Sequence, residues 1–202
     1  MNNRNITTIL DKAFVWITKL AFLNFLWIVF TLIGLGAFGI FPATSAILGV
    51  VRKWLMGNQT VPIRATFIKI YKEEFKYANT IGWILTILGF ILFLNYRNLQ
   101  TAQGELLFVI PFVFYLILFL YLTIVIWAFP LVVHNYASII HQLKNALIIG
   151  ISKIHITITI MLLLFSIMYF SLEFPVLLLF FSFSLLALVW MWLTLRVFKG
   201  VF

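Results

Sequence analysis

The chain has 202 residues, of which 64% are hydrophobic and only 9% are charged, and its formal net charge is +9. Soluble domains carry roughly a quarter charged residues because their surface must face water, so this composition excludes an ordinary soluble domain. It indicates an all-α integral membrane protein, since helices satisfy their own backbone hydrogen bonds in lipid. The excess of Lys and Arg then reflects orientation in a membrane, and we expect no nucleic-acid partner. The absence of cysteine excludes disulfides and thiolate metal sites.

Apolar blocks along the chain predict the membrane-crossing helices, because about 20 residues cross a hydrocarbon core. The first block, residues 13–51, is too long for one crossing and is interrupted by Gly34, Gly36, Gly39 and Pro42. We therefore expect a helical hairpin there. The whole chain, residues 1–202, would form a single membrane domain, a polytopic bundle of six spans. The expected spans are residues 14–33, 38–55, 78–96, 106–130, 154–172 and 176–196.

The distribution of charge distinguishes six crossings from five. With six, both termini share a side with the connections 56–77 and 134–153, and that side holds 13 of the 14 Lys and Arg residues. In the alternative, the first block gives one span near residues 22–41 while residues 43–56 lie at the interface, and the split is 10 to 4. Because Lys and Arg near span ends prefer the cytoplasm, the sequence favours six spans with both termini cytoplasmic.

The two connections expected in the cytoplasm are both amphipathic. In residues 62–77, apolar side chains recur at helical spacing and most cations lie elsewhere, a pattern typical of a helix over anionic lipid headgroups. Pro130 is expected to kink the span before residues 134–153, which carry a second apolar stripe. We take this basic cytoplasmic face as the candidate surface for a partner or for lipid. Its cations are Arg52, Lys53, Arg64, Lys69, Lys72, Lys76 and Lys144.

No motif in the sequence predicts catalysis, a metal or a cofactor. Residues 34–39 match the Gly-x-Gly-x-x-Gly pattern of dinucleotide sites, but they follow an apolar helix, so we interpret them as a turn. His134 and His141 are seven residues apart, yet no carboxylate or cysteine nearby completes a metal site. Asn24 and Asn95 lie inside predicted spans, where an amide either bonds to a neighbouring helix or lines a polar path.

Three stretches of the sequence, residues 23–27, 41–57 and 129–146, resemble the YesL family of bacterial membrane proteins, which is grouped under a domain of unknown function. The residues that carry the resemblance are Asn24, Trp27, Pro42, Ala43, Thr44, Arg52, Lys53, Trp54, Pro130, Lys144 and Asn145. The small residues after Pro42 suit close helix packing, and Arg52 with Trp54 suits an anchor at the membrane interface. The resemblance implies an accessory component encoded beside carbohydrate uptake permeases and sensor kinases, with no catalytic residues to carry over.

We therefore expect a non-enzymatic accessory or regulatory protein of the bacterial cytoplasmic membrane. It would dock a permease or a sensor kinase through its basic cytoplasmic face, in contact with anionic lipid headgroups. The alternative is a transporter or channel subunit for a sugar or another neutral solute, in which Asn24 and Asn95 would line a path. No carboxylate lies inside a predicted span, which argues against an ion-driven pump.

Overall fold

The computed structural model describes residues 3–99 and 109–201, and these residues form helices joined by short connections, without a strand. This confirms the expected all-α class. The helices of the described residues are α1 (Asn3–Ile33), α2 (Ile40–Leu55), α3 (Ile63–Leu99), α4 (Val109–His134), α5 (Ile139–Ser152), α6 (Ile154–Glu173), α7 (Pro175–Phe180) and α8 (Ser182–Val201).

Four helical segments of the described chain are long and apolar enough to cross a membrane. They are Leu10–Ile33, Ile63–Arg97, Val109–His134 and Ile154–Glu173. Ser182–Phe198 is apolar but shorter. Large apolar side chains stand exposed along α1, α3, α4, α6 and α7, as expected of surfaces that face lipid rather than water.

The first two helices, α1 and α2, form a hairpin around the glycine-rich turn. Gly36 takes a φ of 71° in this turn, a left-handed conformation that glycine adopts without strain. At the open end of the hairpin, the ring of Trp16 packs edge-on against Trp54, with 5.5 Å between centroids. The Lys19 ammonium donates a hydrogen bond to the carbonyl of Gln59 at 2.9 Å. The chain therefore enters and leaves the hairpin at the same end.

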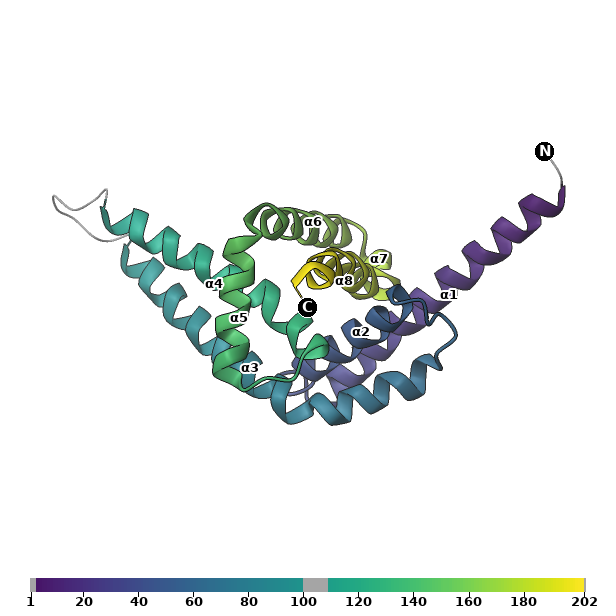
Figure 1. Cartoon of the computed structure of the whole chain (residues 1–202), viewed down its shortest axis with the longest axis horizontal. Coiled ribbons are helices and arrows are strands. Elements are labelled where there is room, and N and C mark those ends of the chain that lie inside the picture. Colours follow the sequence, from purple (N-terminus) through teal and green to yellow (C-terminus); the bar gives the residue numbers. More distant parts are fainter. Residues whose placement is uncertain (1–2, 100–108, 202) are drawn as a thin grey trace.

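A single helix of 37 residues, α3, takes the place of the predicted connection at 56–77 and span at 78–96. Phe67 and Tyr71, in the first half of α3, are buried in the protein core, so their face of the helix rests on protein and not on lipid. This half lies beside α2, where Ile70 packs on Gly49. The second half pairs with α4, and the two halves run in different directions (Figure 1).

The C-terminal part of the chain also departs from the expected pattern. Helix α4 continues through Pro130 to His134, and a short connection leads to α5, which corresponds to the second amphipathic segment. The predicted span at 176–196 is divided at Phe181 into α7, of six residues, and α8. No glycine or proline lies at this break, so the sequence does not predict it.

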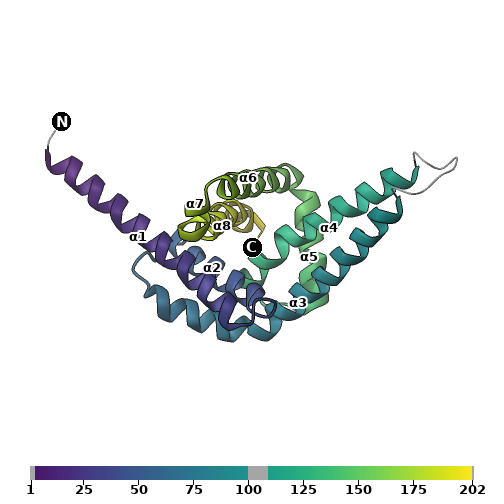
Figure 2. The same ribbon diagram turned by 180° about the vertical axis from the view of Figure 1, so that it is seen from behind.

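Helix α2 lies at the centre of the protein core, where it packs against α1, α3, α4 and α8. Ten of its residues are buried, among them the small residues Pro42, Ala43, Ser45 and Ala46 that predict close packing. The start of α1 and the paired ends of α3 and α4 project from this core in opposite directions (Figures 1 and 2).

Candidate functional site

Asn24, in the middle of α1, joins the two helices on either side of the break at Phe181. Its side-chain nitrogen donates to the carbonyls of Leu178 at 3.3 Å and Leu179 at 2.7 Å. Its side-chain oxygen accepts from the backbone N–H of Phe183 at 2.9 Å and of Ser184 at 3.2 Å. One fully buried amide thus satisfies carbonyls at the end of α7 and N–H groups at the start of α8.

Two further residues of the family resemblance lie beside Asn24. The ring of Trp27 stacks on Phe183, with 3.7 Å between centroids. Its indole N–H donates to the Thr44 hydroxyl at 3.3 Å, and that hydroxyl donates to the carbonyl of Ile40 at 2.7 Å. The hairpin of α1 and α2 is therefore connected through polar groups to the start of α8.

Asn95, the other asparagine predicted to lie inside a span, has a different environment from Asn24. It is exposed near the end of α3, and its amide donates to the carbonyl of Ile91 in its own helix at 2.8 Å. This bond adds nothing to the packing of separate helices. The two amides therefore differ in their bonding: Asn24 joins separate helices, and Asn95 bonds within its own helix.

On the basic side of the protein, the connection between α4 and α5 is fastened to α3. The Tyr77 hydroxyl donates to the carbonyl of Ala137 at 2.6 Å. Tyr136, in the same connection, hydrogen bonds through its hydroxyl to Glu74, a carboxylate only 4% exposed. This bond raises the pKa of the Tyr136 phenol above its ordinary value. The two segments expected in the cytoplasm thus form one continuous surface.

The sequence did not lead us to predict the contacts of Glu74, Tyr77 and Tyr136, although the position of Glu74 was informative. Glu74 falls at helical spacing with Phe67, Tyr71 and Ala78, so it lies on the apolar face of its helix. A carboxylate at such a position requires a hydrogen-bond partner from elsewhere in the fold. The sequence does not show that the partner is 62 positions further along the chain.

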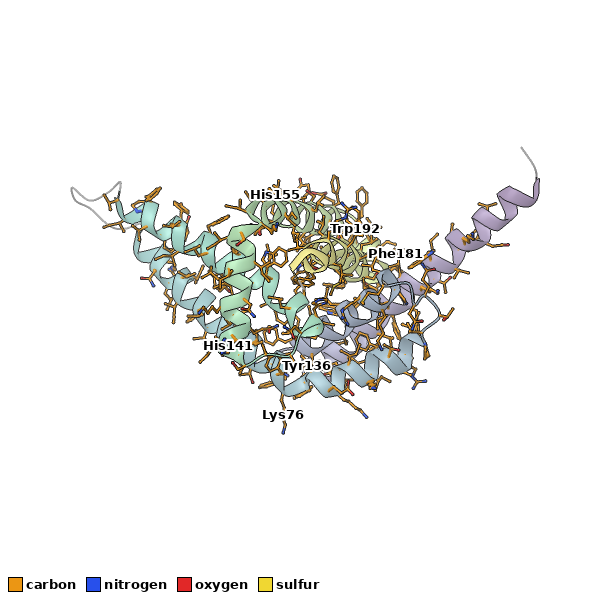
Figure 3. The ribbon with its side chains drawn as sticks, viewed as in Figure 1. Lys76, Tyr136, His141, His155, Phe181 and Trp192 are labelled. Carbon is orange, nitrogen blue, oxygen red and sulfur yellow. The ribbon has the colours of Figure 1, made fainter. Side chains whose placement is uncertain are left out.

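The cations predicted on α3 are all exposed, as is Lys144 on α5. Lys69, Lys72 and Lys76 fall within an arc of about 60° of the helix surface, since successive residues turn by about 100°. We call these three lysines the lysine strip. Lys69 lies 3.9 Å from Glu73, a loose exposed pair. Lys76 points away from the body of the protein, below the connection that carries Tyr136 (Figure 3).

Arg52 and Lys53 are half-buried and lie in the last turn of α2. The Arg52 Nε donates to His134 Nδ1 at 3.2 Å, and the His134 ring stacks on Phe198 at 4.4 Å. These contacts bring together the C-terminal parts of α2, α4 and α8. The expectation that Trp54 is an interfacial anchor was wrong, because this side chain is 1% exposed and packs inside the protein.

The remaining motif residues are spread over α4 and α5. Pro130 is buried within α4, and Asn145 is half-buried beside the exposed Lys144. His141 and His155 lie on separate helices, well apart (Figure 3). Within the part of the chain that the structure describes, no three His, Asp or Glu residues come together as a metal site.

These features describe a helical protein with the character of a membrane protein and with no recognisable catalytic centre among the described residues. A family model described as "Protein of unknown function, DUF624" matches residues 20–96. This range includes the first two stretches of the resemblance and excludes the third.

Three relatives from Bacillus subtilis (strain 168) are similar over most of the chain. YesV is 34% identical over 196 residues, covering 96% of this chain and 94% of YesV. YteU is 33% identical over 160 residues, covering 79% and 72%, and YesL is 31% identical over 149 residues, covering 74% and 70%. All three are described as uncharacterized. The chain belongs to this YesL-like family of unknown function. No solved structure matches it.

Proposed function

We propose that this protein is a non-enzymatic accessory or regulatory component of the bacterial cytoplasmic membrane. It docks a partner protein through the lysine strip on α3. The observation that carries this proposal is the combination of exposed cations with a rigid support. Lys69, Lys72 and Lys76 lie on a helix whose opposite face holds the buried Phe67 and Tyr71.

A rigid basic surface suits docking for an energetic reason. Binding costs free energy for every side chain and segment that must be ordered, and a helix already packed on the protein needs little further ordering. The bonds of Tyr77 and Tyr136 extend this rigid surface from α3 to the connection that precedes α5. An acidic surface on the partner would be attracted by the strip, with a strength that falls as salt rises.

The surroundings of the lysine strip argue for a partner or water, and against lipid chains. An exposed lysine within hydrocarbon costs about 2.5–3.5 kcal/mol. The apolar face of this part of α3, which we expected to lie on lipid, instead packs against the α1–α2 hairpin. Anionic lipid headgroups at the edge of the strip remain compatible with the proposal. The partner class, a carbohydrate permease or a sensor kinase, rests on the family resemblance.

Six spans with both termini in the cytoplasm belong to the same proposal. The hairpin of α1 and α2 supports it, because Lys19 and Gln59 meet at the open end and the chain enters and leaves there. The alternative of five spans requires residues 43–56 to leave α1 and lie alone at the interface. The meeting of Arg52, His134 and Phe198 also fits a common side for the ends of α2, α4 and α8.

A transporter or channel subunit has less support. The side-chain amide of Asn24 is hydrogen-bonded to the backbone on both sides of the break between α7 and α8, so it is not free to bind a solute. The Asn95 amide donates a hydrogen bond within its own helix. The described cavity between α3 and α4, about 400 Å³, is lined by aromatic and apolar residues with Gly89, and its surface is mainly apolar. Solute flux into reconstituted vesicles above that of empty controls would restore this alternative.

A pull-down from native membranes tests the docking proposal with a matched control. The test variant Lys72→Glu/Lys76→Glu reverses two charges of the strip. The control Lys12→Glu/Lys153→Glu makes the same change at two exposed cations that we also expect in the cytoplasm. We expect partner recovery to fall in the test variant alone, and recovery to fall with added salt for the unaltered protein. Equal recovery by both variants contradicts the proposal.

A further inference from the structure

The break between α7 and α8 is an unusual place for a helix to stop. The surrounding sequence, Leu178-Leu-Phe-Phe-Ser-Phe-Ser-Leu185, is mainly apolar and free of glycine and proline. Helix-breaking backbone inside a membrane protein persists only where other groups satisfy the released N–H and C=O groups. Here Asn24 does so for both sides of the break with one side chain.

Helix α7 lies beside α1, α6 and α8, but its side chains are not enclosed by them. None of its six side chains is buried, and Val176, Leu179 and Phe180 are between 46% and 67% exposed. The hydrogen bonds from Asn24 to Leu178 and Leu179 fasten the end of α7 to α1.

There is also room beside α7. A cavity of about 320 Å³ lies between α1 and the α7–α8 break, and its exposed surface is entirely apolar. Trp27, Leu32 and Leu179 are among its lining residues. The hydroxyl of Ser182, the first residue after the break, is buried and has no hydrogen-bond partner in the described part of the chain. A buried hydroxyl in this state has bonding capacity that another arrangement could use.

We propose that α7 is a hinged segment, that Phe181 is the hinge, and that Asn24 is the latch that holds it in the described position. When the amide of Asn24 releases the carbonyls of α7, the segment turns about Phe181 toward the cavity beside α1. The start of α8 stays in place through the stack of Trp27 on Phe183. The movement closes the cavity between α1 and α7 to the membrane. This goes beyond the docking function and does not depend on it.

The first test is backbone hydrogen exchange of the protein in lipid nanodiscs. In Asn24→Leu, which keeps the size of the side chain, we expect amides 176–184 to exchange at least about 10-fold faster, because several hydrogen bonds are lost. Asn24→Asp keeps an acceptor for Phe183 and Ser184 but has no donor for α7. It should speed exchange in residues 176–181 while leaving these two amides protected. Asn95→Leu is the matched control and should change neither segment.

A distance measurement distinguishes hinge motion from general loss of stability. The chain has no cysteine, so Leu32→Cys and Leu179→Cys place spin labels only on the two exposed positions beside the cavity. We expect the Asn24→Leu background to add a second population of inter-label distances, and the Asn95→Leu background to keep one. A single unchanged distance in both backgrounds overturns the hinge. Faster exchange spread evenly over all helices would show that Asn24 only stabilises the fold.

Discussion

Replacing Tyr77 and Tyr136 by Phe removes the two hydroxyl groups that fasten the connection 135–138 to α3. The Tyr77 hydroxyl bonds to the Ala137 carbonyl at 2.6 Å, and a neutral hydrogen bond of this kind contributes about 0.5–1.5 kcal/mol. The bond to Glu74 has a charged acceptor, for which about 1.5–3 kcal/mol is typical. Tyr136 is 80% exposed, so water replaces much of that bond and we count only about 1 kcal/mol.

The two losses together favour the detached connection by about 2 kcal/mol, which corresponds to roughly a 30-fold larger open population. Cleavage of the connection 135–138 by chymotrypsin measures this population, because proteolysis tracks the population of the open form when opening and closing are fast. Chymotrypsin cuts after Tyr and after Phe, so its site at position 136 is kept in the double variant. We expect cleavage there to be about 30-fold faster in the double variant, with cleavage elsewhere little changed. Tyr169→Phe is the control, since this tyrosine on α6 is exposed and its ring contacts Phe165 and Phe170 of the same helix.

An unchanged rate of cleavage at residues 135–138 would refute the reasoning. It would mean that packing alone holds the connection, and that the two segments proposed to lie in the cytoplasm form one surface for a reason other than these hydroxyls. A 30-fold increase in the Tyr169→Phe control would equally remove the specificity of the result.

Three further changes test the fold. The Trp127 indole N–H donates to the Thr157 hydroxyl at 2.9 Å, so Thr157→Val leaves this N–H buried without an acceptor. We expect the unfolding free energy, measured by denaturation in mixed micelles, to fall by about 1–2 kcal/mol. In the control Thr159→Val, at an exposed position, it should fall by under about 0.5 kcal/mol. Gly82→Ala would place a Cβ 2.2 Å from an aromatic ring of α2 and should cost about 1–3 kcal/mol in the same assay. A topology reporter fused before Met1 should report from the cytoplasm, and an external signal would reject six spans.

The sequence predicts the features that depend on local composition. Apolar blocks of the right length give the all-α class and the positions of α4 and α6, and the glycines at 34–39 give the hairpin turn. Asn24 was identifiable as important because an amide within an apolar span requires a partner. Its partners, the backbone groups of residues 178–184, lie about 155 positions away and follow from a break that no residue type signals.

Features that depend on packing between distant segments could not be predicted. Residues 63–77 have the pattern of an interfacial helix, but the face expected to rest on lipid rests on the α1–α2 hairpin, and the helix continues as α3. Trp54 follows two cations, which favours an interfacial anchor, yet it is buried against Trp16. In both cases the sequence shows that a side chain seeks an apolar environment, and it does not show whether protein or lipid supplies it.

The proposed docking through the lysine strip is tested most directly by joining it covalently to its partner. A carbodiimide couples a lysine amine to a carboxylate only when the two are in contact, and it adds no spacer. After treatment of native membranes, peptide mass spectrometry should find Lys72 or Lys76 linked to an acidic residue of another membrane or cytoplasmic protein. The same links should be absent from Lys72→Glu/Lys76→Glu and retained in Lys12→Glu/Lys153→Glu. Links confined to residues of this chain, or links to other proteins that come equally from the exposed Lys12 and Lys153, would contradict the account.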